Sequence, residues 1–188
     1  MTAAGTRRDA LRAAGGVALA ASAAPLLLGV RDAFAAAAGD EGTMLAAVRL
    51  EQALVVAYRT LQGSPALDAR AVSLARRFGD QEQQHLAAVT KQLQNLGGVM
   101  PAEPAPAMVK AGRRAVTDLH TQPALLAFAG ALEANAIAAY YEAQQSLQRD
   151  SFLQVTAAIM ASEGQHLALL REALRRPPVP HAFETGRP

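Results

Sequence analysis

The sequence predicts an all-α protein, in which two antiparallel helical hairpins joined by a long crossover form a four-helix bundle. Hydrophobic residues make up 51% of the chain but aromatic residues only 4%, so the apolar content is mostly Ala and Leu, which favour helices. In four long segments the apolar residues recur at the three- and four-residue steps of one helical face. No segment shows the alternating pattern of a strand, and this absence completes the prediction.

The first 35 residues are predicted to be an export signal outside the fold. They combine a basic start, an apolar stretch and a small-x-small sequence, "AFA", that ends at Ala35. The paired Arg7 and Arg8 resemble a twin-arginine signal, so we expect cleavage near Ala35 and a periplasmic or extracellular protein. We then expect membrane contact only during export. An uncleaved membrane anchor is the alternative, because the apolar run approaches the length that spans a bilayer.

Capping and helix-breaking residues divide residues 36–176, the predicted bundle, into its elements. We expect helices from Thr43 to about Gly63, from Asp68 to about Gly97, from Thr121 to about Gln148 and from Asp150 or Ser151 to about Arg176, with a short helical piece over 113–119. Residues 177–188 are rich in Pro and have no periodicity, so we expect a mobile tail.

An internal repeat relates the two predicted hairpins. It pairs Glu51 with Glu133 and Tyr58 with Tyr140, each 82 residues apart, and Glu82 with Glu163 and His85 with His166, each 81 apart. The neighbouring residues also agree, with "EQQHLAAV" in one copy and "EGQHLALL" in the other. This similarity indicates that one hairpin is a duplicate of the other.

Polar residues interrupt the apolar stripe of every predicted helix. In the second helix, the stepping that joins Phe78 to Val89 passes through Glu82 and His85. The same holds for Glu51, Glu133, Glu163 and His166 on the other stripes. A buried carboxylate or imidazole is costly unless something pairs with it, so these positions are candidate ligands.

Two divalent cations would remove this cost. Four glutamates carry four negative charges, two neutral imidazoles carry none, and two divalent ions would make the buried site neutral. Each Glu-x-x-His places both side chains on one helical face, about one turn apart. Carboxylate and imidazole ligands suit iron or manganese, and zinc is a further candidate. The alternative is a hydrogen-bonded polar layer that fixes helix register, although four carboxylates in such a layer would repel one another.

Charge and cysteine content exclude several other functions. The net charge of +2 arises entirely within residues 1–35, and the rest of the chain has 18 − 4 = 14 basic and 16 − 2 = 14 acidic residues. A neutral domain without a basic run is a poor candidate for binding nucleic acid. The chain has no Cys, which excludes disulfides, thiolate metal sites and thiol nucleophiles.

The order of one Glu, then Glu-x-x-His, then the same again resembles the ferritin-like di-iron carboxylate proteins, with bacterioferritin and rubrerythrin the nearest comparisons. The resemblance covers about residues 43–176. By position it implies that Glu51 and His85 hold one metal ion, that Glu133 and His166 hold the other, and that Glu82 and Glu163 bridge the two. Tyr58 and Tyr140 match a site-adjacent tyrosine of that family, and ordinary core aromatics are the equal alternative.

The resemblance implies two iron ions, or two manganese ions, that react with O₂ or peroxide in a ferroxidase-, peroxidase- or catalase-like reaction. A chain without Cys cannot hold the cysteine-ligated iron of rubrerythrin, and Gln83 stands where bacterioferritin has its haem-binding Met. The Pro-rich tail also cannot supply the fifth helix of a storage cage. Two other functions stay open: a metal-binding protein without turnover, and a structural, stress-related bundle. The sequence also leaves a homodimer open.

Overall fold

The structure is a computed structural model, and it describes residues 34, 37, 39–101 and 104–187. The predicted export signal therefore lies outside the described residues, apart from Phe34. All regular elements in the described part of the chain are helices, which confirms the all-α prediction.

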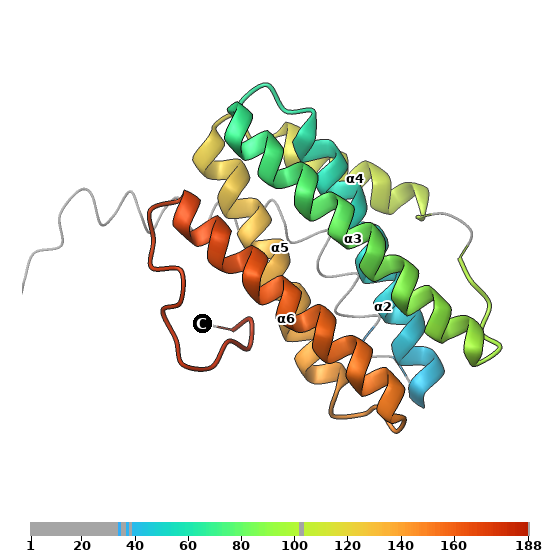
Figure 1. The fold of residues 1–188 in the computed structure, drawn as a ribbon. Helices are drawn as coiled ribbons and strands as arrows, with labels where there is room; N and C mark the ends of the chain where they lie inside the picture. Colours follow the sequence, from blue (N-terminus) through green and yellow to red (C-terminus); the bar gives the residue numbers. More distant parts are fainter. Residues whose placement is uncertain (1–33, 35–36, 38, 102–103, 188) are drawn as a thin grey trace, which may run out of the picture.

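The structure describes five helices in this part of the chain. They are α2 (Gly39–Gln62), α3 (Ala69–Asn95), α4 (Pro106–Thr117), α5 (Gln122–Ala143) and α6 (Asp150–Ala173). Figure 1 shows the four long helices side by side, with the short α4 of the crossover packed against α2. The hairpin α2–α3 faces the hairpin α5–α6, with α3 against α6 and α2 against α5. The predicted pair of hairpins joined by a crossover is thus present.

Two of the predicted helix starts are confirmed, and at both of them a side chain caps the helix. Asp68 accepts a hydrogen bond from the Ala71 amide at 2.8 Å, and Thr121 accepts one from the Ala124 amide at 3.4 Å. The start at Thr43 was wrong, because α2 begins at Gly39 and buries Thr43 inside the helix, where its hydroxyl donates to the Gly39 carbonyl.

The crossover helix and the helix ends also differ from expectation. α4 begins at Pro106 instead of about residue 113, since proline suits the first position of a helix, where no amide donor is needed. α5 ends at Ala143 and α6 at Ala173, both a few residues earlier than the periodicity predicted. Periodicity locates a helix better than it locates its last turn.

The interior of the bundle is apolar and closely packed. The largest buried side chains include Phe128, Phe152 and Leu132. Gly79 lets α3 approach α2 closely, because a Cβ at this position would lie only 3.2 Å from the Cβ of Tyr58. α5 is long and apolar enough to cross a membrane, but 56% of that stretch is buried in the bundle, as in the core helix of a soluble protein.

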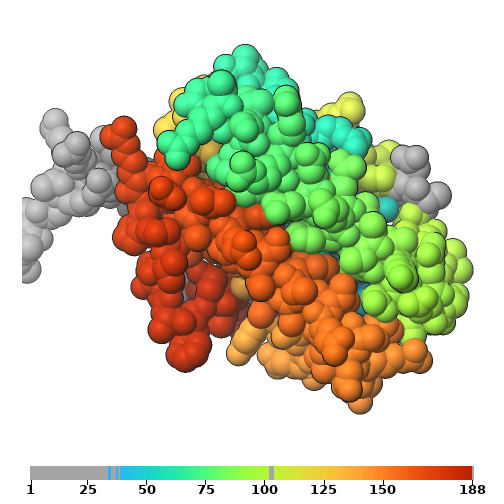
Figure 2. Space-filling model, in the orientation of Figure 1, coloured from blue at the N-terminus to red at the C-terminus, as the bar shows by residue number. Residues whose placement is uncertain are grey.

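The tail lies along the α5–α6 hairpin. Figure 2 shows it beside α6, on the side of α6 that faces away from α3. Arg171 of α6 pairs with Glu184 at 2.6 Å, and Arg187 pairs with Glu142. These ion pairs give the tail defined contacts, and its mobility stays a prediction.

The end of α6 offers a test of backbone strain. The chain leaves α6 through Arg175 in a left-handed conformation, with φ 56°, and the Arg176 amide donates to the Arg171 carbonyl. α3 ends in the same way, but there Gly97 takes the left-handed position, with φ 76°. A side chain at such a position costs about 1 kcal/mol relative to Gly.

Arg175→Gly is therefore expected to raise the free energy of unfolding by about 0.5–1 kcal/mol, because strain is relieved at some cost in unfolded-chain entropy. Gly97→Ala should lower it by a similar amount. Urea denaturation of both variants measures the two changes. An Arg175→Gly variant that is less stable than the parent would contradict this account of the helix end.

Candidate metal centre

All four long helices contribute to one buried polar cluster. It contains Glu51 from α2, Glu82 and His85 from α3, Glu133 from α5, and Glu163 and His166 from α6. The four glutamates are fully buried, the His166 side chain is 2% exposed and the His85 side chain 13%. These six positions are those that interrupt the apolar stripes, so the structure brings together the whole predicted ligand set.

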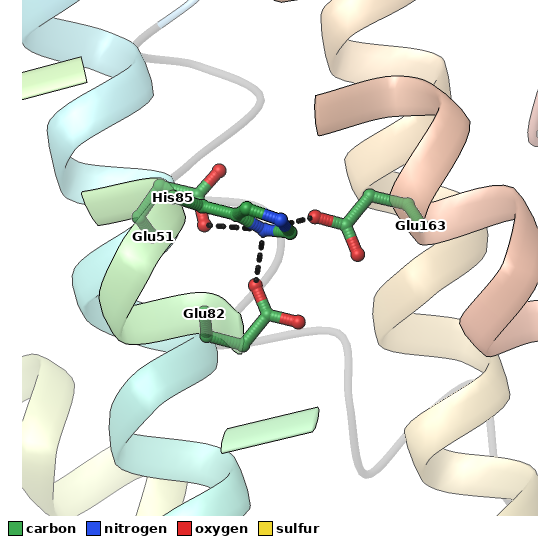
Figure 3. Close-up of side chains that lie close together, drawn as sticks. All are labelled: Glu51, Glu82, His85 and Glu163. Atoms are coloured by element: carbon green, nitrogen blue, oxygen red, sulfur yellow. Dashed lines mark hydrogen bonds and ion pairs between the residues drawn. The ribbon is translucent and has the colours of Figure 1, made fainter. Parts of the chain in front are cut away.

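One group of possible ligands surrounds the His85 ring. The Nδ1 atom of His85 lies 3.0 Å from Glu163 Oε1, 3.3 Å from Glu82 Oε2 and 3.9 Å from Glu51 Oε2. Figure 3 shows that these side chains point toward one another from three helices, α2, α3 and α6. They form the first of two groups, each able to offer its ligand atoms within 4.8 Å of one another.

The second group surrounds His166. Its Nδ1 atom lies 3.0 Å from Glu163 Oε2, 3.3 Å from Glu82 Oε1 and 3.6 Å from Glu133 Oε1. Glu82 and Glu163 therefore turn one carboxylate oxygen toward each histidine. This is the arrangement expected of two bridging carboxylates between two ions.

The donor atoms fit divalent cations in size and chemistry. Two ligands on opposite sides of an ion, each about 2.1 Å away, lie about 4.2 Å apart, so groups within 4.8 Å need little contraction. Each group offers three carboxylates and one imidazole, a mixed set that suits iron, manganese or zinc.

Several buried atoms of the cluster make no hydrogen bond of good geometry among the described residues, although some of them lie within ion-pair distance of a histidine nitrogen. They are Glu51 Oε2, Glu82 Oε1, Glu133 Oε2, both carboxylate oxygens of Glu163, and His166 Nδ1. Such atoms are costly to bury, and native structures contain few of them. A hydrogen-bonded polar layer would satisfy them internally, so this alternative fits the geometry poorly. Cations fit it well, because every one of these atoms is able to act as a ligand.

Burial and mutual repulsion strongly perturb the acids. Burial, reinforced by the Glu82 and Glu163 carboxylates, raises the pKa of both Glu51 and Glu133 well above the usual range. Burial also acts to raise the pKa of Glu163. The contacts of this carboxylate with His166 and His85 outweigh burial and lower its pKa to about 2.

The histidines respond in the opposite sense. Burial alone would lower their pKa values, but the Glu163 and Glu82 carboxylates raise the pKa of His85 to about 9. At His166 the Glu133 carboxylate, followed by Glu163 and Glu82, outweighs burial and raises the pKa to about 12. In the metal-free protein, protons therefore supply the positive charge that the carboxylates require.

The two predicted tyrosines hold carboxylates across the bundle. The Tyr58 hydroxyl of α2 donates to Glu133 of α5, and the Tyr140 hydroxyl of α5 donates to Glu51 of α2. Burial, followed by the nearby carboxylates, raises the pKa of both phenols well above the usual value, so both stay protonated donors. Each tyrosine occupies one Oε1 and leaves Oε2 of the same glutamate without a partner. The tyrosines are thus buried core residues that also orient two candidate ligands.

Two further residues at the site contact His166. Gln81 Oε1 lies 2.9 Å from His166 Nε2, and the Phe78 ring stacks on the imidazole with a centroid distance of 4.0 Å. The apolar stripe placed Phe78 in the core, but nothing in the sequence indicated Gln81. Its contact depends on how α3 packs against α6, which the periodicity of one helix does not specify.

Comparison with known families gives a match over most of the chain. The ferritin-like domain matches residues 30–176, a span that includes the complete cluster and both tyrosines. Comparison with curated proteins and with solved structures gave no match. Because the matched span covers well over half of the chain and its fold and buried cluster are those described above, the chain belongs to the ferritin-like family.

Proposed function

We propose that this protein holds two divalent metal ions, iron or manganese, and uses them to react with O₂ or peroxide. The observation that carries the proposal is the sharing of Glu82 and Glu163, each of which turns one oxygen toward each histidine in a buried site. Zinc remains the candidate that would bind without redox chemistry.

Each ion would have its own pair of ligands, and two further carboxylates would be shared between the ions. Glu51 and His85 would hold one ion, Glu133 and His166 the other, and Glu82 and Glu163 would bridge them. Four carboxylates and two divalent ions leave the buried site neutral, which removes the repulsion that burial imposes on the acids. Tyr58 and Tyr140 fix the two terminal carboxylates by hydrogen bonds from the opposite hairpin.

A pair of redox-active ions, when bound, would supply two electrons to one oxidant, and the side chains around the site would hold the ions and exclude water. The four carboxylates are fully buried and the apolar Phe78 ring stacks on His166, so bulk water is kept from the carboxylates. The ligand order is close to that of bacterioferritin and rubrerythrin. The chain lacks Cys, and a tail with several prolines follows the bundle, so we propose a small relative without a thiolate-bound iron or a storage shell.

Anaerobic loading with Fe²⁺ tests the proposal. The protein should bind two Fe²⁺ per chain and then consume O₂ rapidly when air is admitted, as measured with an oxygen electrode and iron analysis. Loading with Mn²⁺ and adding peroxide tests the manganese form. Stoichiometric binding without consumption of either oxidant would identify a metal-binding protein without turnover. A melting temperature that a chelator leaves unchanged would instead indicate a structural bundle.

We also propose that the protein is exported. Lysine at both Arg7 and Arg8 should stop export of a fused reporter in a bacterial host, since the twin-arginine route reads this pair as its address. Arg31→Lys is the matched control and should leave export unchanged. Cell fractionation measures the result, and N-terminal sequencing should find cleavage near Ala35. Export that survives the double replacement would show that another route is used.

A further inference from the structure

The two halves of the cluster differ, although the hairpins that build them are duplicates. The spacing of 81 residues that pairs Glu82 with Glu163 also pairs Phe78 with Ile159 and Gln81 with Ser162. The aromatic ring and the amide therefore occur in only one copy of the repeat. Both of these side chains contact a histidine of the other hairpin, His166.

His166 is held on two sides. An amide oxygen only accepts hydrogen bonds, so the contact between Gln81 Oε1 and His166 Nε2 places a proton on Nε2. This leaves Nδ1 as the atom that faces Glu82, Glu133 and Glu163. The Phe78 ring, stacked at an interplanar angle of 23°, restricts rotation of the imidazole.

His85 has no comparable support in the described part of the chain. Its side chain is 13% exposed, against 2% for His166, and its polar contacts are with candidate ligands only. The position that matches Gln81 is Ser162, which makes no hydrogen bond to His85 among the described residues. An imidazole without a second partner must be ordered by the ion itself, and this ordering weakens binding.

We propose that the two half-sites fill unequally. The ion held by Glu133 and His166 binds first and exchanges slowly, whereas the ion held by Glu51 and His85 binds second and exchanges readily with solvent. Gln81 is the positioning residue that creates the difference, through the orientation of His166. This inference rests on the proposed dinuclear centre and adds an order of binding to it.

Anaerobic titration of the full chain with Co²⁺ tests the order, because Co²⁺ reports its ligand set through visible absorption bands. The parent protein should bind one Co²⁺ tightly and a second more weakly. Gln81→Ala should weaken the first step by about 10–100-fold and shift the bands of the first equivalent, since an orienting partner typically contributes that much. Ser162→Ala is the matched control at the equivalent position, and it should change neither step.

Gln81→Glu should restore the first step, because a carboxylate also accepts the proton of Nε2. Melting of each metal-free variant shows that the fold is retained. Two ions that bind in one indistinguishable step, or a Ser162→Ala variant as weak as Gln81→Ala, would overturn the order of filling and leave the metal centre standing. No stoichiometric binding of Co²⁺, Fe²⁺ or Mn²⁺ by the parent protein would overturn the metal centre, and the order with it.

Discussion

Replacement of Glu82 by Ala is expected to abolish tight binding of both metal ions, together with consumption of O₂ or peroxide. Glu82 turns one oxygen toward His85 and the other toward His166, so its loss removes a ligand from both groups at once. Loss of a partner that only orients a ligand already costs 10–100-fold in affinity, so loss of a shared ligand should cost at least about 100-fold. Equilibrium dialysis with metal analysis measures the affinity, and oxidant uptake measures the activity.

Asp80→Ala is the matched control for this experiment. Asp80 lies on the same helix, two residues earlier, and its side chain is exposed, so the replacement removes the same charge outside the cluster. Metal content and oxidant uptake should both match those of the parent. Unchanged turnover in Glu82→Ala would exclude chemistry at this pair of sites.

The metal should also remove a loss of stability with rising pH that the metal-free protein shows. In the metal-free protein the pKa of His85 is raised to about 9 and that of His166 to about 12, above the value of about 6.5 in an unfolded chain. A raised pKa stabilises the folded state fully below the unfolded value, and this stabilisation is lost as the pH rises through the folded value. The raised pKa values of Glu51 and Glu133 act in the same direction, because the folded protein prefers the protonated acids.

The metal-free protein should therefore become less stable between pH 6.5 and 9, and the shift at His85 alone corresponds to about 3 kcal/mol. Metal binding displaces these protons, so affinity for the ion rises over the same range. When the concentration of free ion is 100 times the dissociation constant, binding adds about 2.7 kcal/mol to the free energy of unfolding. The difference in melting temperature between Mn²⁺-loaded and chelator-treated protein should widen as the pH rises.

Calorimetric melting at pH 6.5, 7.5 and 9, in chelator and in anaerobic Mn²⁺, measures both trends. His85→Ala should flatten the decline of the metal-free protein, whereas His120→Ala, at an exposed position in the crossover, should not. A metal-free protein whose stability rises with pH would contradict the protonation of the cluster described above.

Much of the fold and of the site follows from the sequence because both depend on helical periodicity. Glu51, Glu82 and Glu133 lie on apolar stripes, and a helix that buries its stripe must bury them as well. Asp68 and Thr121 cap the helices that follow them, since their side chains accept hydrogen bonds from amides three residues later. The start of α2 could not be predicted in this way, because Thr43 has a capping side chain but uses it inside the helix.

The sequence by itself determined which face of each helix is buried and which polar side chains that face carries inward. Only the tertiary structure decided that Tyr58 bonds to Glu133, that Tyr140 bonds to Glu51, and that Gln81 reaches His166. The first kind of information depends on neighbours three and four residues apart, which the order of residues specifies. The second depends on the relative rotation and offset of two packed hairpins, and these are set by the contacts of the whole core.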